Sequence, residues 1–460
     1  MNKHKDKIGL ILGIIVLLII WNLKIEGLTT EGQRGLSLSL MTVIFWATKV
    51  SHSGFVAGLY LVSLVLFEIA PLTDIFMPWT QQLIYLIIGA YLIASSVKSS
   101  GLGERIAYKF ILKFGNSYKN TILSIFGLTF ILSLLIPHPW PRAFIIMSVI
   151  HVVINSADLP EEDGAILGFA VFVASVPISM IFLTGDSSIN ILAVEFSGVK
   201  LSWLGWLYQM GIPATFASIL TCLLFLKIFK INSDFNINKT KIRNKLKNLG
   251  PLSQKEKKTI FWLVLAIMLW MTDSIHGIDL GWVTLTIAML MSFPIIGGVI
   301  SSDDWKQVPI EVLIFLTAAI AIGNVGSITG MNSWIAEQIL PASMPENILF
   351  FALLVSTVSI FLHMILGSVI AAMGVVIPTF IAFTSGNASI NPLVPALLAY
   401  TSIALHYILP FHHISILVGL GENNGLYTDK FVRKLGIPLT FIVYIIVIFQ
   451  VIWWSLTGLI

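Results

Sequence analysis

Charged residues and cysteines are both scarce in this sequence, and the two shortages narrow the class of protein. Only 11% of the 460 residues are charged, whereas 57% are hydrophobic, and the mean hydropathy is +0.92. Soluble globular domains carry about 25% charged residues. The single cysteine, Cys222, excludes a disulfide framework and a cysteine-rich metal site. The composition therefore predicts a polytopic membrane protein.

The motifs of several enzyme classes are also missing. The sequence has no His-Glu-x-x-His, no nucleotide-binding glycine loop and no cluster with the spacing of metal ligands. A membrane-embedded enzyme that uses His412, His413 and Asp186 for acid-base chemistry remains a distant alternative. The formal net charge of +4 does not indicate a nucleic-acid partner, because the basic residues collect in loops where membrane topology explains them.

Apolar runs follow one another along the whole chain. Several of them are shorter than the roughly 20 residues that a spanning helix needs, and these favour broken helices or re-entrant hairpins. We therefore expect an all-α fold of about 10–12 transmembrane helices. Residues 1–7 include Lys3, Lys5, Asp6 and Lys7 and precede an apolar run, as in a signal peptide, but 21–24 offer no small-residue cleavage site. We read this segment as a retained first helix.

A basic segment near the middle of the chain sets the orientation. Ten Lys or Arg residues and two acids lie between 227 and 258. By the positive-inside rule this segment and the basic N-terminus are cytoplasmic. We expect a multi-pass protein of the cell membrane.

The two halves of the chain resemble each other. Four pairs of landmarks lie 224 to 230 residues apart: Trp46 and Trp270, Gly101 and Gly330, His138 and Ser368, and Gly185 and His412. The loop after Gly101 is basic, whereas its counterpart, 328–347, has no Lys or Arg, so equivalent loops lie on opposite sides. The sequence thus predicts two inverted repeats, 1–229 and 259–460, joined by the cytoplasmic loop 230–258. Secondary transporters are often built this way.

The first half is broken at "IPHPWPRAF", residues 136–144. Prolines at 137, 139 and 141 prevent a regular helix, so a hairpin tip is predicted. Arg142 either faces a cavity or pairs with an acid such as Asp186. His138 binds substrate, titrates or bonds a carbonyl group, and Trp140 is either a stacking wall or simple packing.

Three further segments interrupt apolar runs. Gly367 and Ser368 begin a stretch rich in small residues, and 185–188 place Asp186 in apolar surroundings. The repeat partner of 185–188 contains His412 and His413, which accept protons, bind an anion when charged, or hold a metal. Adjacent histidines point apart on both a helix and a strand, which weakens the metal interpretation.

These four segments resemble the divalent-anion/sodium symporter family, which comprises dicarboxylate, citrate and sulfate carriers. Pro137, Arg142 and Ala143 match the frame of the first tip, where His138-Pro139-Trp140 stands in place of the family's Ser-Asn-Thr. Ser368 and Ala371 match the second tip, with Val369 and Ile370 in place of Asn and Thr. The later loops, at 185–188 and 411–414, match the family's loops in position more than in residue type. The segments "SWLGWLYQMGIP" (202–213) and "DKFVRKLGIP" (429–438) match the short segments that follow each loop in the family.

The resemblance implies a secondary transporter of a small anion that works by alternating access and forms a homodimer. A di- or tricarboxylate is the first expectation for the substrate, and sulfate the second. The substrate-binding residues expected are His138, Pro139, Trp140, Arg142, Asp186, Ser187, Ser188, Asn190, Gly367, Ser368, His412 and His413. No resident cofactor is expected. Sodium, as a coupling ion, would bind near His138, Gly185, Gly367 and Ser368.

Two questions stay open at this point. Clustered histidines at 138, 363, 406, 412 and 413, with Asp186, make coupling to protons or exchange an alternative to coupling to sodium. A cation/proton antiporter of the same superfamily is the alternative function, with Asp186 and the histidines as its exchange site.

Overall fold

The computed structural model describes all residues except 1–4, 232–234, 236, 342, 387–389 and 422–423. The described part of the chain is helical, and its one β contact is an isolated bridge between Leu420 and Tyr427. The prediction of an all-α fold is confirmed. Seven described helices are long and apolar enough to cross a membrane, and four shorter helices are apolar as well. These helices confirm the prediction of a polytopic membrane protein.

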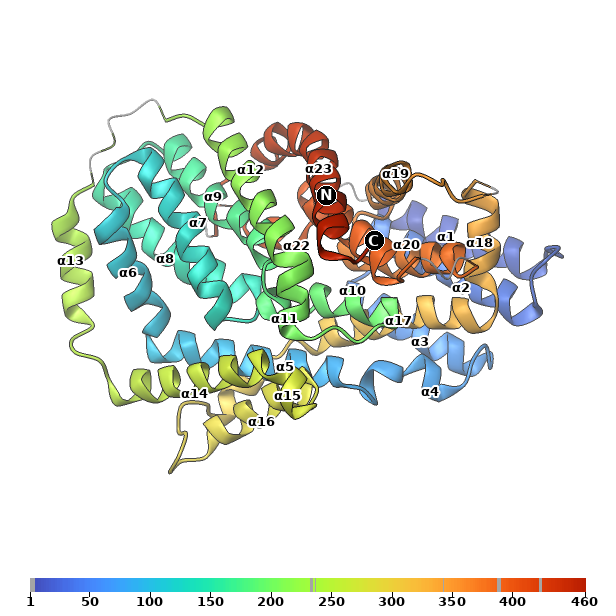
Figure 1. Ribbon diagram of the computed structural model, residues 1–460, viewed down its shortest axis with the longest axis horizontal. Coiled ribbons are helices and arrows are strands. Elements are labelled where there is room, and N and C mark those ends of the chain that lie inside the picture. The colour runs from blue at the N-terminus through green and yellow to red at the C-terminus, as the bar shows by residue number, and fades with distance from the viewer. Residues whose placement is uncertain (1–4, 232–234, 236, 342, 387–389, 422–423) are drawn as a thin grey trace.

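Helices follow one another closely in both halves (Figure 1). The first half contains α1 (Lys5–Asn22), α2 (Thr30–Thr48), α3 (Ser53–Leu66), α4 (Leu72–Ile75), η1 (Met77–Trp79), α5 (Gln82–Ser100), α6 (Leu102–Phe114), α7 (Tyr118–Leu135), α8 (Pro139–Ser156), α9 (Glu161–Ser179), η2 (Leu183–Asp186), α10 (Ile189–Ser197), α11 (Trp203–Trp206), the π-helical turn η3 (Leu207–Gly211) and α12 (Ile212–Ile228).

The basic segment is partly helical, and the second half then repeats a similar order. It contains α13 (Lys239–Asn248), α14 (Gln254–Met271), α15 (Asp273–His276), α16 (Leu280–Ser292), η4 (Ser302–Gln307), α17 (Ile310–Ile328), α18 (Met331–Ile339), α19 (Ile348–Leu366), α20 (Val369–Thr384), α21 (Leu393–Leu405), η5 (Pro410–His412), α22 (Ile414–Val418) and α23 (Asp429–Thr457).

The breaks fall at equivalent places in the two halves. Gly101 (φ +80°) separates α5 from α6, and Gly330 (φ +76°) separates α17 from α18. Both glycines adopt the left-handed conformation that ends a helix without a steric penalty. A short 3-10 turn precedes α10 in the first half and α22 in the second. Each half then ends in a long helix with a Gly-Ile-Pro sequence near its start, at 211–213 and 436–438.

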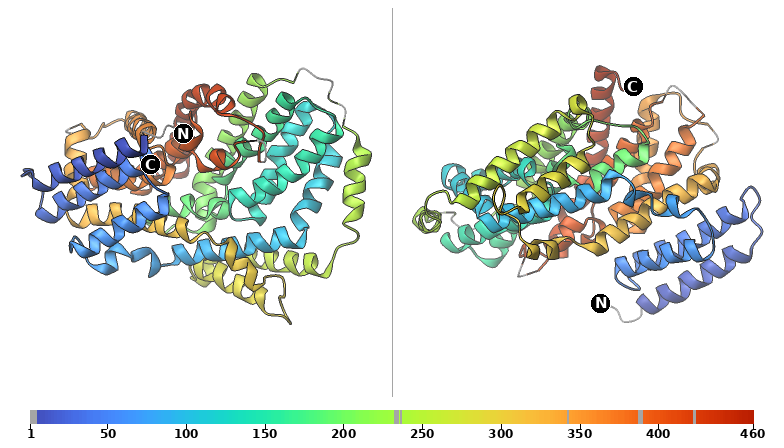
Figure 2. Two further views of the ribbon diagram at one scale, coloured as in Figure 1. Left: turned by 180° about the vertical axis from the view of Figure 1, so that it is seen from behind. Right: turned by 90° about the horizontal axis from the view of Figure 1, so that it is seen from below.

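Helices of one half pack on helices of the other in a reciprocal pattern. α5 lies along α16, and α17 lies along α3. The short helix α10 packs on α20 and α21, while α22 packs on α8 and α9. In Figure 1 the labels of α10 and α22 lie between the teal helices α7–α9 and the orange helices α19 and α20. The view from behind in Figure 2 shows the same two groups.

Two cavities mark opposite faces of the molecule. One, of about 490 Å³, is lined by Lys227, Lys230, Lys430 and Lys434, with the start of α9; we call this side the basic face. The other, of about 1040 Å³, is lined by 194–202 and by parts of 273–282; we call it the second cavity. Residues 203–228 form a 26-residue helical span between them, about 39 Å long. The chain therefore reaches the second cavity after α10, whereas it reaches the basic face after α22.

The basic segment is anchored by a buried ion pair. The Arg105 guanidinium in α6 donates to Glu256 through Nε (2.5 Å to Oε1) and Nη2 (3.1 Å to Oε2). It also donates to the carbonyl oxygens of Leu249, Gly250 and Pro251. Glu256 in turn accepts from the Ser253 amide at 2.8 Å and so closes the start of α14. These contacts tie the segment that joins the two halves to α6.

Replacing Glu256 by glutamine is expected to lower the free energy of unfolding by about 3 kcal/mol, because it leaves the buried Arg105 without its counter-charge. The hydrogen bond from Arg105 holds the pKa of Glu256 below its ordinary value of 4.5. A carboxyl group whose pKa is lowered in the folded state stabilises the fold at pH values above its ordinary pKa. This stabilisation is lost as the pH falls through the folded-state pKa. Thermal unfolding in detergent at pH 7 measures the loss.

Asp303→Asn provides the control for this measurement. Asp303 pairs with Lys306 at 2.6 Å, but their side chains are 80% and 77% exposed. Such an exposed pair contributes little to stability. A Glu256→Gln protein that unfolds at the same temperature as Asp303→Asn would contradict the assignment of a buried, stabilising pair.

Candidate functional site

The first break in the apolar core is the turn between α7 and α8. Pro137 and Pro139 lack an amide hydrogen, and α8 starts at Pro139 with His138 as its N-cap. The His138 Nδ1 accepts from the Trp140 amide at 3.3 Å, and the Nε2 lies 2.9 Å from the Tyr91 hydroxyl on α5. His138 is 3% exposed. The turn is thus buried in the protein rather than a surface loop.

Arg142 joins this tip to the segment around η2. The fully buried guanidinium donates to the carbonyl oxygens of Ile136 (3.3 Å) and Gly185 (2.7 Å), and to the Ser179 hydroxyl. The Ser187 amide donates to the Pro137 carbonyl oxygen at 3.3 Å, which adds a second link. Arg142 therefore fixes the relative position of the two segments, and its positive charge stays in the core.

The segment around η2 is held by its own side chains. Asp186 Oδ1 accepts from the amides of Ser188 (3.1 Å) and Ile189 (3.4 Å), at the start of α10. Asn190 Nδ2 donates to the carbonyl oxygens of Ser179, Phe182 and Leu183 at 2.8 to 3.3 Å. The bond to Ser179 satisfies a carbonyl group at the end of α9, and the other two hold the turn that leads into η2. The Asn190 Oδ1 accepts from the Tyr400 hydroxyl on α21, so the contact reaches the second half.

The second break lies between α19 and α20. Gly367 has φ +62°, and a Cβ atom there would lie 2.9 Å from the Phe411 ring. Only glycine fits both conditions without strain. Ser368 caps α20 by accepting from the Ala371 amide at 3.5 Å. The second tip thus packs on the 409–413 segment, which carries His412 and His413.

The two adjacent histidines point to different neighbours, as their spacing predicts. The His412 ring contacts His363 and His406, at centroid distances of 5.4 and 5.5 Å. The His413 ring lies 6.2 Å from Tyr407, and its Nδ1 accepts from the Ser415 amide at 3.2 Å. Among the described residues no group of three or more His, Cys, Asp or Glu side chains has the arrangement of a metal site.

Buried polar atoms without a hydrogen-bond partner gather around these breaks. Fourteen side-chain atoms of this kind occur in the described residues. At the first tip and η2 they are Trp140 Nε1, Arg142 Nε, Ser187 Oγ and Ser188 Oγ; on the second-half segments they are His406 Nε2, Tyr407 Oη, His412 Nε2 and Ser415 Oγ. A buried polar group left unpaired costs about 1–3 kcal/mol. The four atoms at the first tip all belong to N–H or O–H groups, which suits an anion.

The structure thus groups the predicted residues in two sets. His138, Pro139, Trp140, Arg142, Asp186, Ser187, Ser188 and Asn190 form the first cluster, and Gly367, Ser368, His412 and His413 border the second. The bond between Asn190 and Tyr400, together with the packing of α10 on α20, connects them. The sequence does not reveal Tyr91 and Tyr400, since a tyrosine in an apolar run is usual in a membrane protein. The polar Ser179 at the end of an apolar run is a weak signal.

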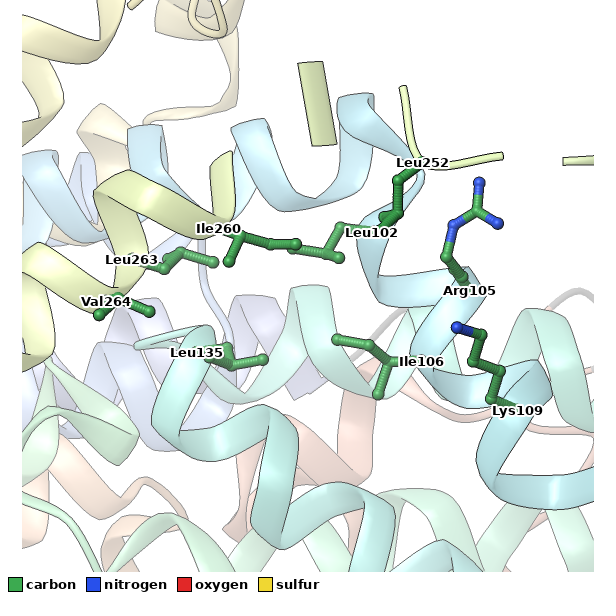
Figure 3. Close-up of a pocket in the computed structure, with 9 residues that line it drawn as sticks. All are labelled: Leu102, Arg105, Ile106, Lys109, Leu135, Leu252, Ile260, Leu263 and Val264. Atoms are coloured by element: carbon green, nitrogen blue, oxygen red, sulfur yellow. The ribbon is translucent and has the colours of Figure 1, made fainter. Parts of the chain in front are cut away.

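Two of the surface cavities lie apart from the predicted site residues. The second cavity is lined by Glu195, Asp273, Asp279 and Lys200, so its carboxylates outnumber its cations. Figure 3 shows a third cavity, of about 310 Å³, between α6, α7 and α14. Its lining is aliphatic except for Arg105 and Lys109, and Arg105 is already paired with Glu256. None of the predicted site residues lines either cavity.

Comparison with known proteins gives consistent matches over the chain. Residues 4–460 match the profile of a family described as "Sodium:sulfate symporter transmembrane region". A protein named "Membrane protein" from Cupriavidus necator is 23% identical over 98% of this chain and 93% of its own length. "Dicarboxylate transporter 2, chloroplastic" from Spinacia oleracea is 26% identical over 94% and 79%. "Putative malate transporter YflS" from Bacillus subtilis is 26% identical over 72% and 71%.

Proposed function

Because this chain belongs to the sodium:sulfate symporter family, a family of membrane transporters and not of enzymes, we propose that it carries a dicarboxylate across the membrane by alternating access. The observation that carries this proposal is the set of unpaired N–H and O–H groups beside Arg142. The relatives whose names give dicarboxylates or malate support the choice over sulfate.

The two clusters suit the two ends of such a substrate. One carboxylate would bind at the first tip, to Arg142 Nε, Ser187 Oγ and Ser188 Oγ. The other would lie toward His412 Nε2 and Ser415 Oγ, which are also buried and unpaired. Charge-assisted hydrogen bonds of this kind are the strong ones, and a water-free site strengthens them further. Sulfate would occupy only one of the two clusters.

We further propose that the halves are inverted repeats and that α7–α8 and α19–α20 are re-entrant hairpins. The equivalent positions after α10 and α22 lie at opposite faces. The first tip is buried, and the half-buried second tip packs on the Phe411 ring. Irregular backbone at membrane depth is tolerated where it is packed in protein or lines a cavity. The basic face would be cytoplasmic, with the protein in the cell membrane. A homodimer is expected from the family resemblance alone.

Three modes of coupling are compatible with this transport function: sodium, protons, or exchange for a second anion. A sodium ion needs several oxygen ligands. The Gly185 carbonyl oxygen already accepts from Arg142, and the His412 carbonyl oxygen lies 3.0 Å from His363 Nε2. These two bonds reduce the backbone oxygens open to a cation near Gly185 and next to the second tip.

Ser188→Ala is expected to weaken dicarboxylate binding about tenfold or more without lowering stability. The Ser188 hydroxyl is buried and has no protein partner, so its loss removes a bond to the anion and no bond of the fold. Thermal stabilisation of the purified protein by malate, succinate, fumarate, citrate and sulfate measures the change.

Ser218→Ala is the matched control, because the Ser218 hydroxyl on α12 is also buried but bonds the Ala214 carbonyl oxygen of its own helix at 2.8 Å. It should bind dicarboxylates as the native protein does. Stabilisation by sulfate alone, unaffected by Ser188→Ala, would contradict the proposed substrate class.

A further inference from the structure

Three fully buried histidines form a cluster beside the second tip, which we call the histidine triad: His363 on α19, His406 at the end of α21 and His412 at the end of η5. Their side chains are at most 1% exposed. The three ring centroids lie 5.2 to 5.5 Å from one another, and the rings of His406 and His412 are inclined by only 25°. Each ring therefore lies next to both others in the apolar core.

The hydrogen bonds decide which nitrogen carries a proton in the neutral triad. His363 Nε2 lies 3.0 Å from the His412 carbonyl oxygen, which only accepts, so this nitrogen carries the hydrogen. His363 Nδ1 is then an acceptor, and the His406 Nδ1 at 3.1 Å must be the donor. A neutral His406 with its hydrogen on Nδ1 has a free lone pair on Nε2. That atom is buried and has no partner.

His412 has the opposite tautomer. Its Nδ1 lies 3.2 Å from the Ile408 amide and 3.4 Å from the Leu409 amide, and both amides donate. The hydrogen of neutral His412 is therefore on Nε2, which is also buried and without a partner. Of the six ring nitrogens in the triad, only His406 Nε2 is a basic nitrogen that no donor occupies. An added proton can bind only there without breaking a bond.

The surroundings of the triad contain little charge. Helices α19, α20 and α21 have no Asp, Glu, Lys or Arg, and none of the ion pairs recorded between described residues includes a triad member. α9 and α23 carry their charged residues near their starts, at the basic face. Other titratable or charged groups near the triad are His413, Tyr407, Lys49 against the Phe411 ring and, toward the first tip, Tyr400, Asp186 and Arg142. α2, which also packs on α19, carries Glu31 and Arg34 near its start.

We propose that His406 Nε2 is the binding site of a coupling proton, which the histidine triad accepts only when a carboxylate of the substrate lies beside it. This inference rests on the proposed dicarboxylate transport. The proton comes from water on one side of the membrane, adds to the Nε2 lone pair, and is released with the substrate on the other side.

The dependence of proton binding on the substrate follows from the burial of the site. A lone imidazolium in an apolar core without a counter-charge is strongly disfavoured. A carboxylate beside His406 Nε2 supplies the counter-charge and accepts a hydrogen bond from His412 Nε2. Proton and dicarboxylate then strengthen each other's binding by the same factor, as linkage requires. This mutual dependence is what a symporter needs to avoid carrying either one alone.

The test is calorimetry of fumarate binding in sodium-free buffers that differ in their enthalpy of ionisation. Fumarate stays fully ionised from about pH 6 to about pH 8, so any proton taken up belongs to the protein. We expect uptake of about one proton per fumarate, and a Kd that rises about tenfold per pH unit. Fumarate binding without proton uptake would overturn the inference and leave the proposed function intact. No binding of any dicarboxylate would instead overturn the proposed function.

His406→Asn locates the proton. The asparagine amide can replace Nδ1–H as donor to His363, but it has no basic nitrogen in the place of Nε2. We expect this variant to bind fumarate without proton uptake and with a Kd independent of pH. His151→Asn, on α8 away from the site, should keep both properties. Proton uptake that persists in His406→Asn would overturn the assignment. If His406→Asn does not fold, His406→Gln is measured in the same way, with the same expected loss of proton uptake.

Discussion

Gly436→Ala abolishes transport and lowers the free energy of unfolding by about 3 kcal/mol or more. Gly436 lies on α23, and a Cβ atom there would be 1.9 Å from the Tyr407 carbonyl oxygen and 2.9 Å from Ile408 Cα. Both contacts are with backbone, so no side chain can rotate away. The segment between His406 and His412 has to shift, which displaces these two histidines relative to His363 on α19.

Gly58→Ala isolates this steric effect. Gly58 lies in the middle of α3, and a Cβ atom there would meet nothing within 4 Å. Alanine in a helix is more stable than glycine by about 1 kcal/mol, so this variant should unfold at an equal or higher temperature. Thermal unfolding in detergent and uptake of malate by proteoliposomes measure both properties. Equal stability of the two variants would show that α23 and the 406–412 segment are not in close contact.

Arg142→Lys is expected to reduce uptake at least about 100-fold, although the charge is kept. The planar guanidinium donates at once to two carbonyl oxygens and a hydroxyl group, on both sides of the tip. A lysine ammonium cannot reproduce that fork. It would leave the Gly185 or Ile136 carbonyl oxygen unpaired in the core, and each such loss costs about 1–3 kcal/mol. The hairpin tip and the segment around η2 would then lose their fixed spacing.

Arg433→Lys is the control for that measurement. Arg433 makes one exposed hydrogen bond, 2.8 Å long, to Asp429 one turn earlier, and an ammonium group can replace it. Uptake and dicarboxylate affinity should stay within twofold of the native values. If Arg142→Lys also retained native uptake, Arg142 would be neither a tie between the two segments nor a ligand.

The sequence predicts the breaks well because they depend on local chemistry. Pro137 lies in the first break, whereas Pro139 and Pro141 fall in the first turn of α8, where a missing amide hydrogen is tolerated. Gly367 ends α19 in a conformation that other residues avoid. Apolar runs likewise predict helices, because the bilayer leaves few alternatives for the backbone.

The partners of the site residues do not follow from such rules. The tautomers of His363 and His406 depend on a contact between residues 43 positions apart. Asn190 meets a tyrosine 210 positions away. No periodicity in the sequence indicates either pair, because each depends on how separate helices cross. Arg142 illustrates the same limit: its burial is predictable, but its choice of carbonyl oxygens over Asp186 is not.

The packing of helices from the first half on helices of the second half also has a consequence for biosynthesis. The surfaces that α10 packs on, α20 and α21, do not exist until some 200 residues later in translation. At about 5–20 residues per second, Tyr400 emerges about 10 to 40 s after Asn190. During that interval the nascent first half holds a polar amide in the bilayer with one of its partners still unsynthesised. A message that ends after the basic segment would therefore give a product that membrane proteases remove rather than a stable half-transporter.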